Sequence, residues 1–192
     1  TLPAWEVPYV LGEELGLTFV KGDTVKLTSK LVSPKGATQI AAFTGALSDR
    51  VVKSALGTVT QIFIDPTTIG TTADANVIDA RWTLTNGIVS LLTLDNTAVA
   101  KDALRPNPRD WKLELTRYYA NDTELDAFVA KTERKIRIRT LGDALGGTFY
   151  KVDLDVYGQW DTYEKADVDG LGVEKLPLVP FYDATAAPDF SL

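Results

Sequence analysis

The chain has 192 residues, enough for one domain with its own hydrophobic core, and 45% of them are hydrophobic while 24% are charged, as in ordinary globular proteins. The absence of Cys and His excludes disulfides, thiolate nucleophiles, Ser-His-Asp triads and metal sites that need either residue. The net charge of −6 argues against nucleic acid as a tight partner, and the short apolar runs argue against a membrane span.

Alternation of apolar and polar residues predicts strands in the first half of the chain. The expected strands are Thr24–Leu31, Thr58–Ile64 and Val77–Thr85. Asn86-Gly87 follows the third strand, and the alternation resumes over Ile88–Leu94. Because Asn and Gly both tolerate the positive φ that a two-residue turn requires, we predict a β-hairpin at this point.

The second half of the chain predicts three strands and one helix. The strands are Trp111–Tyr119, Arg134–Leu141 and Thr148–Trp160, again by alternation. The helix is expected near residues 122–133, where acidic residues in the first turn and basic residues in the last turn suit the helix dipole. Apolar residues at i, i+3 and i+4 provide its buried stripe.

The remaining segments are expected to be loops and arms. Pro34–Ser48 and Asp65–Asn76 are long stretches of small residues, and loops of that length usually have a function. We expect an N-terminal arm over residues 1–16, a core over 17–160 and an extended C-terminal arm over 161–192. The sequence therefore predicts a single, mainly β (α+β) domain: a β-sandwich or half-barrel with one flanking α-helix, long loops and extended arms.

Charge is distributed unevenly along the chain. Residues 152–192 contain nine acidic residues against Lys165 and Lys175, a net charge of −7 that leaves +1 for residues 1–151. This acidic end is either a solvated polar face, a surface that meets a neighbouring subunit, or a surface that must repel anions. A basic cluster lies just upstream, and we expect it to pair with acids on an adjacent strand or subunit rather than bind nucleic acid, because no aromatic residue is interleaved in it. The cluster consists of Lys131, Arg134, Lys135, Arg137 and Arg139.

Two patterns are weak candidates for carbohydrate chemistry. Asp153 and Asp155 share one face of a predicted strand, and two carboxylates at that spacing are one arrangement for a glycosidase, but a regular strand favours an exposed acidic face instead. The four tryptophans are candidates for a sugar-stacking platform, although Trp82 follows the inward alternation and Trp160 ends a strand. They are Trp5, Trp82, Trp111 and Trp160.

Two further patterns resemble ligand loops incompletely. The stretch Gly142–Thr148 lacks the Lys of a phosphate-binding loop and precedes a strand rather than a helix. The stretch Asp167-Val-Asp169-Gly170, with Glu174 beyond it, lacks the third acid and the flanking helices of a calcium loop. We therefore expect no catalytic residue, no cofactor and no metal, and we expect that the chain is not an enzyme.

The second half of the chain resembles a known family. The run WKLELTRYY, a helix, ERKIRIRTLG, a turn, TFYKVDLDVYGQWD and the tail LPLVPFYDATAAPDF are similar to the major tail tube protein of long-tailed bacteriophages with non-contractile tails. The similarity covers residues 111–192. Residues 1–110 share only general features with the family, namely an extended arm, a hairpin and Thr/Gly-rich loops.

The resemblance implies a structural virion protein. Members of this family fold as a small β-sandwich or half-barrel with one helix and form hexameric rings that stack into a hollow tube. Strands from all subunits join into an inner β-barrel through which DNA passes during ejection. The expected partners are copies of this chain, other tail proteins at the tube ends and phage DNA that passes without tight binding, with no membrane. The expected location is the virion, after assembly in the host cytoplasm.

Particular residues are assigned to these roles as predictions. Asp153 and Asp155 are expected to face the lumen, because a DNA conduit should not attract phosphate. Inter-subunit contacts are expected from the N-terminal arm, the loop Pro34–Ser48 and the C-terminal tail. The contact residues are Trp5, Tyr9, Leu176, Phe181, Tyr182 and Phe190.

Alternative interpretations remain open. In the first alternative, the chain is another phage component, such as a head–tail connector or a capsid decoration protein. In the second it is a monomeric carbohydrate-binding β-sandwich module. In the third it is an enzyme that acts through Asp153 and Asp155.

Overall fold

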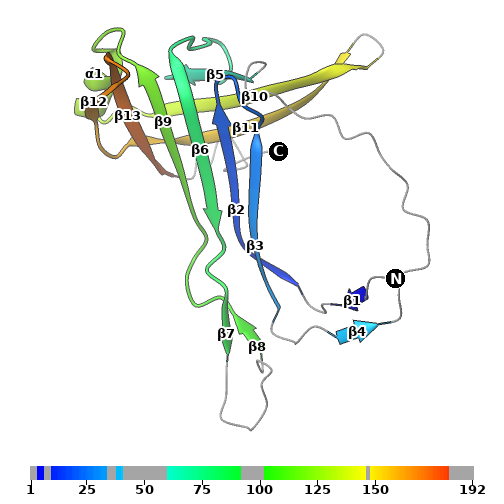
Figure 1. The fold of residues 1–192 in the computed structure, drawn as a ribbon. Coiled ribbons are helices and arrows are strands. Elements are labelled where there is room, and N and C mark those ends of the chain that lie inside the picture. The colour runs from blue at the N-terminus through cyan, green and yellow to red at the C-terminus, as the bar shows by residue number, and fades with distance from the viewer. Residues whose placement is uncertain are drawn as a thin grey trace. The chain divides into compact units, whose positions relative to one another are not determined.

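The computed structural model describes residues 4–6, 10–33, 38–40, 60–91, 102–145 and 148–181 (Figure 1). Over these residues the chain is mainly β with one helix, α1 (Thr123–Val129), so the predicted fold class is confirmed. The strands are β1 (Ala4–Glu6), β2 (Leu11–Val20), β3 (Lys26–Val32), β4 (Thr38–Ile40), β5 (Thr60–Asp65), β6 (Val77–Thr85), β7 (Val89–Leu91), β8 (Asp102–Leu104), β9 (Asp110–Tyr118), β10 (Arg134–Leu145), β11 (Thr148–Trp160), β12 (Glu164–Val168) and β13 (Leu171–Pro180).

Most of these strands form one open sheet. Nine strands follow the order β3-β2-β6-β9-β13-β11-β10-β5, with β12 added beside β13. Within the described residues, the end strands β3 and β5 do not pair with each other, so the sheet does not close into a barrel. Strand β1 pairs with β4, and β7 pairs with β8, in two separate two-stranded sheets.

The described residues fall into two compact units, which we treat separately. The larger unit holds most of β9 to β13 together with α1, β5 and parts of β2, β3 and β6. Its described residues are 17–27, 60–83, 111–145 and 148–181. The smaller unit holds the two-stranded sheets and the remaining parts of β2, β3 and β6. Its described residues are 4–6, 10–16, 28–33, 38–40, 84–91 and 102–110.

The hydrophobic core of the larger unit combines two groups of strands. One group is β6, β9 and β13; the other is β10 and β11, which cross β9 and β13 at a steep angle (Figure 1). In β6 and β9 the buried side chains recur with the period of two that strands impose, whereas adjacent residues are buried in parts of β11 and β13. Burying each large apolar side chain contributes about 1.5–3 kcal/mol. The least exposed are Trp82, Leu113, Leu115, Ile136, Ile138, Leu154, Val156, Trp160, Val173 and Leu176.

A sharp bend in the sheet depends on Gly158. Strand β13 pairs with β9 as far as Leu178 and then with the end of β11, where Gly158 lies opposite Pro180. A Cβ atom at Gly158 would collide with the carbonyl oxygen of Val179 and the side chain of Leu178. Only glycine therefore permits the close backbone approach by which the two groups of strands join.

The hairpin predicted at Asn86-Gly87 is wrong. Strand β7 pairs with β8 rather than with β6, so no two-residue turn joins β6 to β7. Gly87 has a φ of 64°, but Asn86 does not share the positive φ that this turn needs at both positions. Asn86 is held instead by residues distant in the sequence: its backbone N–H donates to the Glu13 carbonyl at 2.8 Å, and its side-chain oxygen accepts from Arg109 Nε at 3.0 Å.

The C-terminal segment is not an extended arm over its described part. Residues 161–192 were expected to lie outside the core, yet β12 and β13 form a hairpin that belongs to the large sheet. Its turn consists of Asp169 and Gly170, with φ angles of 54° and 80°, as a type I′ turn requires. The Asp167 carboxylate accepts the Gly170 N–H at 2.9 Å and stabilises the turn.

The helix α1 is shorter than predicted. The sequence indicated a helix over residues 122–133, but it ends four residues earlier, and its last turn contains no basic residue. Lys131 adopts a left-handed φ of 53° and donates its N–H to the Phe128 carbonyl, while Thr132 donates to the Ala127 carbonyl. This pair of bonds is a Schellman motif, which ends the helix even though the C′ residue is lysine rather than glycine.

Candidate assembly surfaces

Strand β3 is exposed along almost its whole length. Six consecutive residues from Lys26 to Leu31 are exposed, and only Val32 is half-buried. The side chains of Leu27 and Leu31 are 65% and 61% exposed, so the apolar face that the alternation predicted is present but uncovered. Strand β3 therefore adds little to a hydrophobic core and leaves both apolar surface and one backbone edge unprotected.

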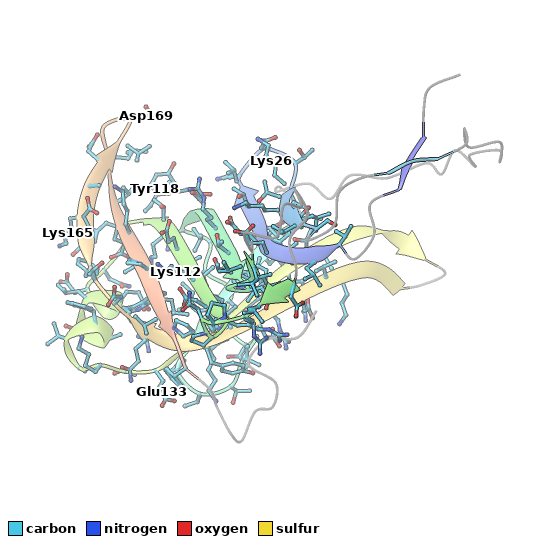
Figure 2. All side chains as sticks on the ribbon, turned by 90° about the horizontal axis from the view of Figure 1, so that it is seen from below. Lys26, Lys112, Tyr118, Glu133, Lys165 and Asp169 are labelled. Atoms are coloured by element: carbon cyan, nitrogen blue, oxygen red, sulfur yellow. The ribbon has the colours of Figure 1, made fainter. Side chains whose placement is uncertain are left out.

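Strand β12 forms a second exposed edge, in the larger unit. It pairs only with β13 among the described strands, and all its residues except the half-buried Ala166 are exposed. At the tip of the hairpin, Val168 lies directly opposite Leu171, and these side chains are 38% and 52% exposed. Figure 2 shows Asp169 at this tip and Lys165 on β12.

The outer edge of β5 is covered by the chain itself. The Ile64 N–H donates to the Thr72 carbonyl at 3.3 Å, and the Asp74 N–H donates to the Ile62 carbonyl at 2.8 Å. The predicted long loop Asp65–Asn76 thus folds back along β5 and occupies its free hydrogen-bonding groups. Of the strands that end the described sheet, β5 is closed, whereas β3 and β12 are open.

The carboxylate of Asp65 holds this loop in place. Asp65 is 1% exposed and accepts backbone N–H groups from Gly70, Thr71 and Thr72 at 2.8–3.0 Å, together with the Thr71 hydroxyl at 2.6 Å. Burial alone would raise the pKa of Asp65, but the hydrogen bonds from Thr71 and Thr72 outweigh it and lower the pKa. Asp65 therefore remains ionised and ordered as an anchor.

The ribbon of β7 and β8 exposes apolar side chains in the smaller unit. Val89 lies directly opposite Leu104, and their side chains are 52% and 49% exposed; Leu91 adds a third at 38%. A two-stranded ribbon of three residues per strand has little stability of its own. It is thus a further candidate for contact with another molecule.

The two predicted lumen residues are bound by arginines on the neighbouring strand. Arg137 donates to both carboxylate oxygens of Asp155 at 2.7 and 2.6 Å, and Arg139 does the same to Asp153 at 2.7 and 2.8 Å. The Arg139 hydrogen bonds lower the pKa of Asp153 despite its partial burial. That these acids face a lumen stays a prediction, but their neutralised charge would repel phosphate less than unpaired carboxylates.

The basic cluster is divided among several partners. Arg137 and Arg139 pair with the adjacent strand, which confirms the preferred interpretation, and Arg134 is buried against Glu124. Lys131 and Lys135 lie over aromatic rings, at 4.8 and 5.7 Å from the ring centroids. The cluster is therefore not a continuous basic patch of the kind that nucleic acids require.

A buried ion network joins α1 to the sheet. Glu124 of α1 is 4% exposed and accepts from Arg134 Nε at 2.9 Å and from Trp160 Nε1 at 2.7 Å. Arg117 of β9 lies 2.8 Å from Asp74 and 2.8 Å from Glu174, the second contact being an ion pair without hydrogen-bond alignment. Sequence reasoning missed this network, because its members come from distant elements and follow no local pattern.

Glu174 is the most deeply buried acid of the network. It is 0% exposed, and burial raises its pKa even though a hydrogen bond from the Tyr163 hydroxyl at 2.6 Å and the nearby Arg117 act in the opposite direction. Burial and the bond to Glu174 raise the pKa of Tyr163 in turn. The Glu174 carboxylate thus joins Tyr163 and Arg117 of β9 within the larger unit.

The predicted contact residues lie in different environments. Leu176 is 0% exposed in β13, so it belongs to the chain's own core and offers no surface to another subunit. Phe181 is half-buried directly after β13, and its N–H donates to the Tyr157 carbonyl at 3.3 Å. Trp5 lies in β1, whose side chains are not described. Tyr9, Tyr182, Phe190 and the loop Pro34–Ser48, apart from the backbone of β4, lie outside the described residues.

The N-terminal arm is shorter than predicted, since β2 begins at Leu11.

The structure does not assemble the other candidate sites. Trp82, Trp111 and Trp160 are buried at 9% exposure or less, so they provide no stacking platform. The residues of the incomplete calcium loop form the β12–β13 turn, and Glu174 points into the ion network instead. Among the described residues no group of three or more acids is arranged to hold a metal ion.

Two cavities are present, one in each unit. The cavity of the larger unit has a volume of about 340 Å³ and is lined by residues including Phe19, Ile62 and Asp79. Burial raises the pKa of Asp79, and its Oδ1 has no hydrogen-bond partner. The groove of the smaller unit has a volume of about 350 Å³ and is lined by residues including Leu15, Leu31 and Leu84.

Comparisons with known proteins identify no relative. No protein-family model matches the sequence, and no curated protein is significantly similar to it. Within the described residues, α1 spans seven residues, and no helix is long and apolar enough to cross a membrane.

Proposed function

We propose that this chain is a structural virion protein: a tail tube subunit of a siphovirus-like bacteriophage that assembles with copies of itself into stacked rings. The tube would conduct DNA during ejection and would contact other tail proteins at its ends. The resemblance of residues 111–192 to this family supports the proposal. The observation that carries it is strand β3, which ends an open sheet with two exposed leucines and an unpaired backbone edge.

An edge of this kind favours self-assembly for a physical reason. Exposed N–H and C=O groups along a strand are a template for pairing with another chain, so monomeric proteins cover them or keep the strand short. This chain covers β5 with its own loop and leaves the seven-residue β3 open. When copies pair edge to edge around a ring, each open strand gains a partner and the exposed leucines lose contact with water.

The arrangement of charge agrees with a mechanical role. In the described residues, buried arginines and acids pair with one another in the ion network and in the bidentate Arg–Asp pairs. Such pairs fix strands and helix relative to one another within the larger unit. We accordingly propose no catalytic residue and no cofactor.

Electron microscopy of the purified protein tests the proposal. Negative-stain images and sedimentation velocity over a concentration series are expected to show hollow tubes of uniform width. A truncation that lacks residues 182–192 keeps every described strand and tests the C-terminal tail, whereas removal from Leu176 onward would delete half of the core strand β13. A protein that stays monomeric at millimolar concentration would refute self-assembly.

The same images separate the alternatives. Isolated rings indicate a connector, and compact trimers indicate a capsid decoration protein. A carbohydrate-binding module would remain monomeric and change its tryptophan fluorescence upon titration with glycans. The burial of Trp82, Trp111 and Trp160 argues against that module, because sugar stacking needs exposed rings.

A further inference from the structure

We propose that strand β3 of one copy pairs with strand β12 of a second copy, and that opposite charge on the two strands makes this association directional. The inference rests on the self-assembly proposed above and names the surfaces that carry it. It follows from three properties of the described strands: which edges are open, how exposed they are, and which charges they bear.

Only β3 and β12 are open among the strands that end the described sheet. The segment that follows β5 hydrogen-bonds to Ile62 and Ile64 and closes that edge. Among the described strands, β3 pairs only with β2, and β12 pairs only with β13. Each therefore presents one row of backbone N–H and C=O groups to a further strand.

Both strands also expose apolar side chains that an added strand would cover. Leu27 and Leu31 on β3 are more than half exposed, and Val168 on β12 is 38% exposed. Pairing removes part of this surface from water while it satisfies the backbone groups. The two gains arise from the same contact, which makes β3 and β12 stronger candidates than exposed loops.

The two strands carry opposite charge. Strand β3 contains Lys26 and Lys30 and no acid, a charge of +2. Strand β12 and its turn contain three acids and Lys165, a charge of −2; the acids are Glu164, Asp167 and Asp169. Figure 2 labels Lys26, Lys165 and Asp169 on these two elements.

The ion pairs that these charged side chains make within the chain are weak enough to be exchanged for pairs with another strand. Lys26 lies 2.6 Å from Asp23, Lys30 lies 2.8 Å from Glu13, and Glu164 lies 3.5 Å from Lys175. The lysine side chains on these two strands and on β13 beside them are 49–64% exposed; they are Lys26, Lys30, Lys165 and Lys175. Exposed pairs of this kind contribute little and reopen readily, so the charges remain available to an incoming strand.

The sign of the charges determines the geometry of the polymer. Like charges placed directly opposite each other destabilise a strand pair, so β3 disfavours β3 of a second copy and β12 disfavours β12. A symmetric dimer through either edge is thereby opposed. Pairing of β3 with β12 is favoured, and such a head-to-tail contact repeats around a ring or along a filament.

Charge reversal tests the pairing without any knowledge of its register. We expect Lys26→Glu/Lys30→Glu to raise the critical concentration for assembly about tenfold, since both edges are then acidic. Glu164→Lys/Asp167→Asn should do the same, since both edges are then basic, while the Asn oxygen still accepts the Gly170 N–H that stabilises the turn. An equimolar mixture of the two variants should assemble again, because each edge finds its opposite on the other variant. The quadruple variant should assemble alone.

Matched controls carry the same change of net charge away from the edges. Lys112→Glu/Lys131→Glu and Glu114→Lys/Glu133→Gln alter exposed residues of β9 and of the segment between α1 and β10, and both should assemble as the unchanged protein does. Circular dichroism of the dilute variants verifies the fold. Assembly of both edge variants at the unchanged critical concentration, or a mixture that stays unassembled, overturns the pairing while the tube proposal stands. Failure of the unchanged protein to assemble overturns both.

Discussion

Removal of the Glu124 carboxylate should destabilise the protein strongly. This side chain binds Arg134 and Trp160 in a site where the glutamate is 4% exposed and the arginine 6%. The variant Glu124→Ala leaves a buried guanidinium and a buried indole N–H without their acceptor. Breaking a buried ion pair by deleting one partner costs about 3–5 kcal/mol.

Urea unfolding of the dilute, unassembled protein measures this loss. Trp160 contacts the deleted carboxylate and serves as the fluorescent probe. With a denaturant slope of about 2–3 kcal/mol per molar urea, the midpoint should fall by about 1–2 M. Against a total stability of about 5–15 kcal/mol, this is a large fraction.

Two further variants determine whether desolvation causes the effect. Glu133→Ala removes an exposed carboxylate that adjoins Arg134 in the sequence and should cost less than about 0.5 kcal/mol. Glu124→Leu/Arg134→Met replaces both partners by apolar groups and should recover part of the loss, because no charge is left unpaired. If Glu124→Ala costs no more than Glu133→Ala, the carboxylate is hydrated in solution and the reasoning is refuted.

Three other perturbations test separate features of the fold. Gly158→Val should prevent the close approach of β11 to Val179 and lower the melting temperature by at least about 5 °C, as measured by differential scanning calorimetry. Leu154→Ala, at a side chain with no exposure, should cost about 2–5 kcal/mol in urea unfolding, whereas Leu27→Ala should leave the stability of the dilute protein nearly unchanged. The lowered pKa of Asp153 means that its ion pair stabilises the fold above the unfolded-state pKa near 4 and that this contribution disappears as the pH falls through the folded-state pKa. The difference in stability between the unchanged protein and Asp153→Asn should therefore shrink in unfolding curves recorded from pH 6 down to pH 2.5, and a constant difference would exclude the pair as its cause.

Local periodicity predicted the elements whose side chains alternate along one buried face. Ile136 and Ile138 were placed inward by the pattern and are 0% and 1% exposed, and Trp82 is buried as its position predicted. These strands follow a rule that operates between adjacent residues, and such a rule is visible in one sequence. The order in which the strands pair cannot be seen in one sequence in this way, because pairing depends on segments that are distant along the chain.

The errors occurred where distant residues outweigh local preference. Asn86-Gly87 favours a hairpin, but Asn86 donates its backbone N–H to the Glu13 carbonyl and accepts from Arg109 Nε, and these bonds hold it in another conformation. Asp169-Gly170 carries an equally good turn signal, yet the strand after it does not alternate: Val173 and Glu174 are adjacent and both buried. Adjacent residues of a strand point to opposite faces, so both faces of β13 are covered at Val173 and Glu174, and the alternation is interrupted there.

The acidic C-terminal region shows why a charge count does not locate a function. Asp153 and Asp155 are neutralised by arginines of β10, and Glu174 is buried against Arg117 and Tyr163. The acids of this region that remain exposed among the described residues are concentrated on β12 and its turn, with Asp161 just before them. The acids of this region therefore fall into three groups. Asp153 and Asp155 bind β11 to β10, Glu174 belongs to the buried ion network, and the acids of β12 and its turn lie on an exposed edge. Only the last of these is available to another molecule, and it lies on the strand that β3, with its two lysines, is suited to meet.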